Sequence, residues 1–201
     1  MKLLLLIVFA SFYKSPGLGT SVRSDLPMRQ AQPDLENRQP GLFSCSNGLV
    51  AFKSEAPLEV IEAESKQLRG VLDPEKQTFA WTVEVQTFEG FNNALQREHF
   101  NENYLESRRF PKATFAGKII ETMDFSKDGT YSVRAKGKLY IHGKEQERII
   151  KSQVVVAGKR IRVEADFRIL LADHDIRIPK IVYQKIAEEV QVLVQADLLR
   201  D

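Results

Sequence analysis

The chain of 201 residues contains one cysteine and three histidines, and this scarcity excludes several kinds of site. A single cysteine cannot form an intramolecular disulfide, so Cys45 is interpreted as a small, partly buried apolar residue. A zinc site on a helix needs a second ligand one turn after the first, but the residue four positions after His99 is Asn103. His99 is therefore interpreted as part of a solvated helix face, and no metal site is predicted.

The motifs of common enzyme classes are also missing. The chain has no Walker loop, no Gly-x-Gly-x-x-Gly fingerprint and no Gly-x-Ser-x-Gly elbow. Asp173, His174 and Asp175 are adjacent potential ligands, but neighbouring residues of a strand point to opposite faces, so they are interpreted as a solvated loop. His142, which precedes Gly143 in an expected turn, is predicted to be exposed. Neither an enzymatic activity nor a cofactor is predicted.

An excess of one charge is absent as well. The formal net charge is +2, and residues 1–19 hold Lys2 and Lys14 but no acid, so removing them would leave 27 basic and 27 acidic side chains. A neutral protein has no electrostatic reason to bind a phosphate backbone. Nucleic acid is therefore excluded as a predicted partner.

Long hydrophobic runs are absent too. The apolar run Leu3–Phe12 is too short to cross a bilayer as a helix; Lys2 precedes it and Pro16 ends it. Residues 1–19 are predicted to be a secretory signal peptide, with an uncleaved anchor as the alternative. The protein is then exported, to a periplasm or to the outside of the cell. Residues 20–42, with three prolines and little apolar periodicity, are predicted to be a disordered arm or linker.

From residue 43 onward, apolar and polar residues alternate along the chain. The clearest stretches are 79–86, 131–142, 160–171 and 190–198. A period of two places one face of a strand on the core and the other in water, as in antiparallel sheets. Residues suited to tight turns lie between the expected strands, at Asp128-Gly129, His142-Gly143 and Gly158-Lys159. An up-and-down barrel removes sheet edges by closure and is favoured; a two-sheet sandwich is the alternative.

Two short helical segments interrupt the expected strands. Asn93 is a plausible N-cap with Gln96 three residues later, which predicts a helix extending to about Leu105. A second helical segment is expected over about 181–187, after Pro179 and before the last strand.

Four stretches between Gly48 and Leu198 resemble the YceI-like family. They are His99–Glu106 (HFNENYLE), Phe110–Phe115 (FPKATF), Gly137–Gly143 (GKLYIHG) and Asp173–Pro179 (DHDIRIP). The resemblance implies an all-β, extended, eight-stranded antiparallel lipocalin-like barrel over residues 43–201. It also implies an isoprenoid-type or quinone-like chain lipid held non-covalently inside the barrel. The family has no agreed catalytic set, so none is transferred.

The expected ligand contacts are the inward residues of the barrel, where small side chains leave room beside bulky ones. They are Phe79, Trp81, Val83, Val85, Phe115, Gly117, Ile119, Val133, Ala135, Gly137, Leu139, Ala165, Phe167 and Ile169. The alternative is a structural or interaction barrel packed solid, in which Ala and Gly only fit the taper.

Two further partners are predicted. The basic outward positions of two strands are interpreted as solvated faces, with a transient contact to a membrane surface as the alternative. These positions are Arg134, Lys136, Lys138, Arg160 and Arg162. The second predicted partner is another copy of the chain, which would form a homodimer.

Overall fold

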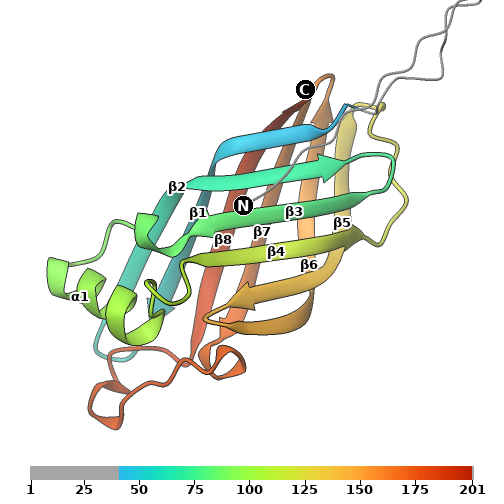
Figure 1. Cartoon of the computed structure of the whole chain (residues 1–201). Helices are drawn as coiled ribbons and strands as arrows, with labels where there is room; N and C mark the ends of the chain where they lie inside the picture. The colour runs from blue at the N-terminus through green and yellow to red at the C-terminus, as the bar shows by residue number, and fades with distance from the viewer. Residues whose placement is uncertain (1–40, 201) are drawn as a thin grey trace, which may run out of the picture. The chain divides into compact units, whose positions relative to one another are not determined.

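Eight antiparallel strands close into one barrel in the computed structural model, which describes residues 41–200 (Figure 1). The strands are β1 Phe43–Glu55, β2 Val60–Asp73, β3 Thr78–Glu84, β4 Lys112–Ile119, β5 Gly129–Ile141, β6 Lys144–Ala157, β7 Arg160–Leu170 and β8 Glu189–Arg200. Each strand pairs with the next along the chain, and β8 pairs with β1. The predicted up-and-down barrel is confirmed, and the sandwich alternative is wrong. The predicted signal peptide and nearly all of the arm lie outside the described residues.

The alternation predicted from the sequence determines which side chains face inward. On β5, Val133, Ala135, Gly137 and Leu139 are buried, whereas the residues that alternate with them face solvent. Four of the five predicted basic positions pair with neighbouring acids: Lys136 Nζ lies 2.6 Å from Glu147, and Lys138 Nζ lies 2.8 Å from Glu145. Arg134 and Arg162 likewise pair with acidic residues, at 2.7 and 3.0 Å. These faces therefore present little net charge to a membrane.

Tight turns join the strands where the sequence predicted them. His142 and Gly143 both have positive φ, 50° and 75°, as the central residues of a type I′ turn must, and they connect β5 directly to β6. Gly158, with φ of 58°, opens the turn between β6 and β7. These short connections fix the register of the three strands.

The helical segments lie at one end of the barrel (Figure 1). The helix α1, Ala94–His99, begins at Asn93, whose Oδ1 accepts a hydrogen bond of 2.9 Å from the backbone N–H of Gln96. A π-helical turn, η3 Phe100–Tyr104, continues it, so the predicted extent is confirmed. The expected helix over 181–187 is wrong: a single 3-10 turn forms there, η5 Lys180–Val182. Two further 3-10 turns are η2, Val85–Thr87, and η4, Leu171–His174.

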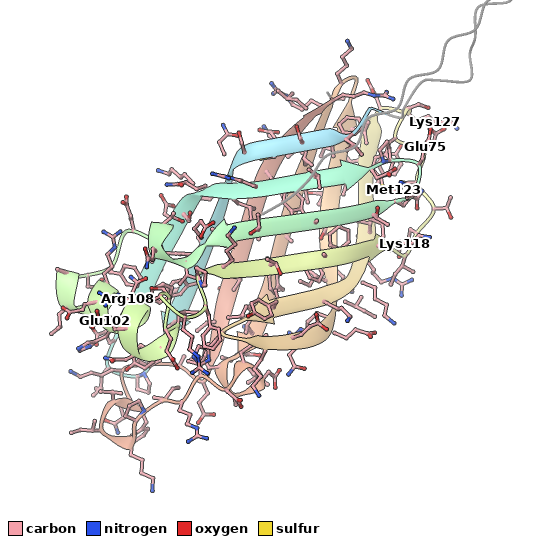
Figure 2. The ribbon with its side chains drawn as sticks, viewed as in Figure 1. Glu75, Glu102, Arg108, Lys118, Met123 and Lys127 are labelled. Atoms are coloured by element: carbon pink, nitrogen blue, oxygen red, sulfur yellow. The ribbon has the colours of Figure 1, made fainter. Side chains whose placement is uncertain are left out.

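The other end of the barrel is packed solid. Phe43, Ile161 and Leu198 are almost completely buried there, at the ends of β1 and β8 and the start of β7. The loop between β4 and β5 adds the buried Met123, whose carbonyl accepts a hydrogen bond of 2.8 Å from Gln77 Nε2. Figure 2 shows Met123 at the end of the barrel opposite to Glu102 and Arg108. The barrel is thus plugged at one end, and any cavity must open at the α1 end.

Candidate functional site

An apolar cavity of about 510 Å³ lies inside the barrel. Every strand contributes lining side chains, and the cavity continues outward to α1, η3 and the segment before β8. Its volume is within the usual range for small-molecule sites, and its lining is apolar except for a few side chains. The barrel therefore matches neither extreme expected from the sequence, because it is filled at one end and hollow at the other.

The structure places twelve of the fourteen predicted ligand contacts on this cavity. They are Phe79, Trp81, Val83, Val85, Phe115, Ile119, Val133, Ala135, Leu139, Ala165, Phe167 and Ile169. Their contact with a lipid stays a prediction. The space beside them comes from the alanines at 135 and 165, which line the cavity among larger apolar neighbours.

The two predicted glycines, Gly117 and Gly137, do not line the cavity. They are partners across β4 and β5, and a Cβ atom added to Gly117 would lie 2.1 Å from the carbonyl oxygen of Lys136. A Cβ atom on Gly137 would lie 2.4 Å from the carbonyl oxygen of Ala116. Their small size allows the two strands to approach each other, and it does not create vacancy for a ligand.

A third glycine, which the sequence analysis missed, determines the position of the single tryptophan. Gly70 on β2 pairs with Trp81 on β3, and a Cβ atom at Gly70 would lie 2.1 Å from the indole ring. The indole therefore lies flat along the barrel wall over Gly70, where a larger residue would push it into the cavity. An isolated Gly inside an alternating stretch is the sequence signal for such a close approach.

Four phenylalanines that the sequence analysis missed surround the wide end of the cavity. Phe52 stacks on Phe100 with ring centroids 5.4 Å apart and an interplanar angle of 11°. Phe88 and Phe91 lie 5.7 and 5.0 Å from the same Phe100 ring. They come from β1, from the segment after η2 and from η3, so no local pattern could have grouped them. Their rings provide an apolar wall just inside the opening.

Polar side chains on the cavity gather mainly at its opening, hereafter the mouth. Asn93, the N-cap of α1, lines the mouth on one side together with Gln96 and His99 of that helix, and Lys185 lines it on another. The Gln96 side-chain amide donates a short hydrogen bond to the carboxylate of Glu59, in the turn between β1 and β2. Deeper polar contributions come from a few hydroxyl residues only, such as Ser152 on β6. A ligand with a polar end and an apolar chain thus meets suitable surroundings for both.

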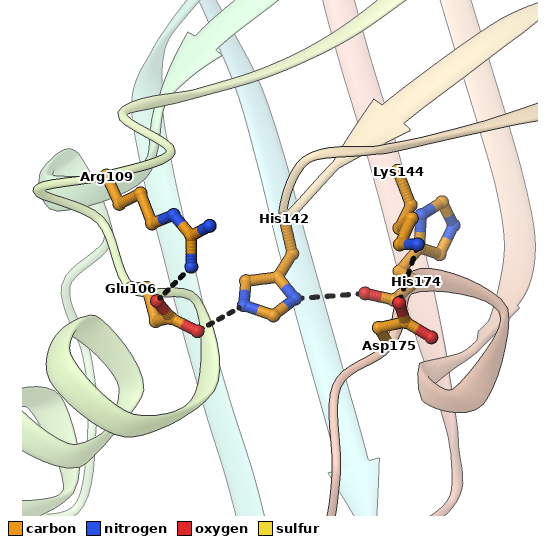
Figure 3. A network of polar contacts seen from close by, with 6 residues as sticks. All are labelled: Glu106, Arg109, His142, Lys144, His174 and Asp175. Carbon is orange, nitrogen blue, oxygen red and sulfur yellow. Dashed lines mark hydrogen bonds and ion pairs between the residues drawn. The ribbon is translucent and has the colours of Figure 1, made fainter.

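A polar network braces the outside of the mouth (Figure 3). His142 Nδ1 lies 2.9 Å from the carbonyl oxygen of His174, and its Nε2 lies 3.0 Å from Glu106 Oε1. The hydrogen bond with His142 is the main reason that the pKa of Glu106 lies below its usual value, and Arg109 adds to the effect. Lys144 Nζ pairs with Asp175 at 2.7 Å. The network joins the segment after η3 to the β5–β6 turn and to η4.

Both histidines of this network differ from the expectation of exposure. The His142 side chain is only 10% exposed because the ring packs edge-on against Phe110, with centroids 4.9 Å apart. His174 is completely buried. Its ring nitrogens face the carbonyls of Ile141 and Lys144, but neither nitrogen makes a hydrogen bond of good geometry. Burial lowers the pKa of His174, so its neutral form is favoured in the folded protein.

Metal ligation has no candidate in the described part of the chain. Within residues 41–200, no three His, Cys, Asp or Glu side chains gather as ligands of one ion. Cys45 is a free, buried residue of β1. None of the helices in this range is long and apolar enough to cross a membrane.

The four motif stretches noted in the sequence converge on the mouth, although they are far apart in the chain. Glu106, Phe110, His142 and His174 each belong to a different stretch, and the contacts above join all four. Residues 50–198 match the model of the YceI-like domain. The chain belongs to the YceI-like family. No curated protein matches it.

Solved structures similar to this YceI-like chain share its fold at low sequence identity. BcnA of Burkholderia cenocepacia is 20% identical, with a TM-score of 0.61, covering 75% of this chain and 95% of BcnA. A polyisoprenoid-binding domain of Saccharophagus degradans, implicated in plant cell wall breakdown, is 13% identical, with a TM-score of 0.66, covering 81% and 100%. The YCEI protein of Campylobacter jejuni is 14% identical, with a TM-score of 0.54, covering 68% and 83%.

Proposed function

We propose that this protein is an exported, non-enzymatic lipid-binding protein that holds one isoprenoid-type chain lipid in its barrel. The observation that carries the proposal is the apolar cavity of about 510 Å³, closed at one end and open at the other. The membership of the YceI-like family supports it, as does the polyisoprenoid binding for which the Saccharophagus degradans domain is named. The apolar run at residues 3–12 supports export.

The cavity volume indicates the length of chain that fits inside. An apolar cavity of about 150 Å³ holds one benzene molecule of six carbons, so about 510 Å³ holds roughly 20 carbon atoms. That corresponds to about four isoprene units at the same density. A longer lipid would extend through the mouth, since the packed end of the barrel offers no exit.

The energetics allow tight binding without a charged anchor. Removing about 400 Å² of apolar surface from water contributes about 10 kcal/mol at ~25 cal/mol per Å². Association and the ordering of a flexible chain offset part of this gain. The polar residues at the mouth, such as Gln96 and Lys185, leave the polar end of the lipid solvated or hydrogen-bonded. The chain therefore enters with its apolar end toward Phe79.

Trp81 provides a direct test, because it is the single tryptophan and it lines the cavity. Delipidated protein is titrated with geranylgeraniol while the tryptophan emission is recorded. Saturation at one lipid per barrel is expected, and Ala135→Phe, which fills the cavity, should abolish the change. Gly158→Asn is the matched control, because a Cβ atom added at that turn position would meet no other atom within 4 Å. The absence of a saturable change with the unsubstituted protein would reject the proposal.

A further inference from the structure

The most exposed apolar side chains of the described chain cluster around the mouth. Ile181 is 91% exposed, Leu58 66%, Tyr183 64% and Leu95 57%. We refer to these four residues as the rim. They come from η5 and its flank, from the β1–β2 turn and from α1, all of which lie at the open end of the barrel (Figure 1). Exposed apolar groups gathered in this way mark an interaction surface.

Backbone and side-chain contacts hold the rim segments together. The backbone N–H of Leu58 donates a hydrogen bond of 2.9 Å to the carbonyl of Gln184, which joins the β1–β2 turn to the segment after η5. The contact between Gln96 and Glu59 joins α1 to the same turn. The rim is thus one surface made of three fastened segments, and the cavity opens between them.

The segment that carries Ile181 and Tyr183 is positively charged. Residues 176–187 contain Arg177, Lys180 and Lys185 and no acidic residue. Within residues 41–200 none of the three takes part in an ion pair, in contrast to the paired lysines on the strand faces. In the neighbouring β1–β2 turn, Glu55 pairs with Lys53, whereas Glu59 keeps its charge and accepts a hydrogen bond from the neutral Gln96 amide. Basic residues next to exposed apolar and tyrosine side chains are typical of surfaces that meet anionic lipid headgroups.

We propose that the rim docks on an anionic bilayer, with the mouth of the barrel facing the membrane. In this position an apolar chain passes between the acyl region and the cavity without crossing water. The inference rests on the proposed function, but it assigns the membrane contact chiefly to Ile181, Leu58 and Tyr183, which do not line the cavity. The rim also replaces the basic strand faces as the membrane-binding surface, because four of the five basic residues on those faces are paired with acids.

Site-specific fluorophores test the orientation. Two variants of the full chain share Cys45→Ser and carry an environment-sensitive dye, one through Ile181→Cys and the other through Lys127→Cys at the packed end. They are mixed with vesicles containing equal parts of phosphatidylcholine and phosphatidylglycerol. A blue shift at position 181 with no shift at position 127 is expected. An unchanged dye at position 181, as a rim made for a protein partner would give, overturns the proposal, and so do equal shifts at both positions.

Charge reversal tests the electrostatic part. Arg177→Glu combined with Lys180→Glu should weaken binding to the same vesicles at least tenfold, since each basic residue near an anionic surface contributes about fivefold. The matched control, Lys118→Glu with Lys127→Glu at the packed end, should bind as the parent does (Figure 2). Equal weakening by both pairs contradicts a specific docking face.

The two proposals can fail separately. The rim variants should still take up geranylgeraniol from detergent micelles, measured by Trp81 emission, because Arg177, Lys180 and Ile181 do not line the cavity. If the parent protein takes up lipid from micelles but does not bind the vesicles, the docking surface alone is rejected. Failure of the parent protein to take up lipid from micelles rejects the proposed function itself.

Discussion

Gly117 on β4 and Gly137 on β5 lie directly opposite each other, so closely that a Cβ atom on Gly117 would come within 2.5 Å of Gly137 Cα. The contact is between backbones, which cannot move aside as a flexible side chain can. These glycines therefore belong to the wall of the barrel, whereas the alanines at 135 and 165 belong to its hollow. The distinction separates substitutions that disturb the fold from substitutions that disturb the ligand.

Gly137→Ala is expected to lower the free energy of unfolding by about 1–3 kcal/mol, the usual cost of forcing extra atoms into a packed region. The added methyl group would meet the carbonyl of Ala116 at 2.4 Å, so β4 and β5 must separate. Urea unfolding measures the effect. Gly158→Asn, at a positive φ that Asn tolerates, should change stability little. Equal stability of Gly137→Ala and the parent protein would show that β4 and β5 do not approach each other closely at this position.

Ala135→Phe is expected to cost less stability than Gly137→Ala although it adds far more atoms. The new ring would extend into the cavity that Ala135 lines, and cavity filling lacks the clashes of overpacking. Loss of lipid binding should accompany this tolerance. Urea unfolding measures the loss of stability, and lipid titration followed by Trp81 emission measures the loss of binding. Severe destabilisation would indicate a barrel filled by its own side chains.

Two phenylalanines test the asymmetry of the barrel. Phe43→Ala, at the packed end, should cost about 3–5 kcal/mol because the removed ring leaves a void among tightly packed neighbours. Phe167→Ala, on the cavity wall, should cost clearly less and weaken lipid binding instead. Comparable losses of stability for both variants would contradict a hollow confined to the open end.

His174 should make stability depend on pH. Burial lowers its folded pKa below the ordinary value of 6.5, so the unfolded chain binds more protons between the two values. Stability is then full above about pH 6.5 and falls as pH drops toward the folded pKa, by at most ~1.4 kcal/mol per pH unit. His174→Gln should reduce this dependence, measured by urea unfolding at several pH values. His99→Gln, at an exposed position of α1, should retain it; the same slope in all three proteins would argue against a role for His174.

The sequence predicted the architecture well because the barrel depends on a local pattern. Period-two alternation assigned the inward face of β5 and β7, and turn residues such as Gly143 and Gly158 marked where the chain reverses. Inward residues of a closed barrel are also the residues that line its cavity. The predicted cavity wall therefore followed from the same pattern, with the two wall glycines as the exception.

The mouth could not be predicted because it depends on contacts between distant segments. His142 and His174 looked like turn and loop residues, and only tertiary packing buries them against Phe110 and the β5–β6 turn. The aromatic wall around Phe100 likewise combines segments separated along the chain. The helix expected over 181–187 failed because the segment leaves Ile181 and Tyr183 in solvent, so no buried face stabilises helical turns there.

Native mass spectrometry of the full chain, purified without detergent and then incubated with geranylgeraniol, tests directly whether the barrel holds a lipid. One apolar chain lipid per barrel is expected, either retained from the cell or taken up, which organic solvent releases and Ala135→Phe excludes. A spectrum that shows only the mass of the polypeptide before and after incubation would rule out a lipid-binding barrel.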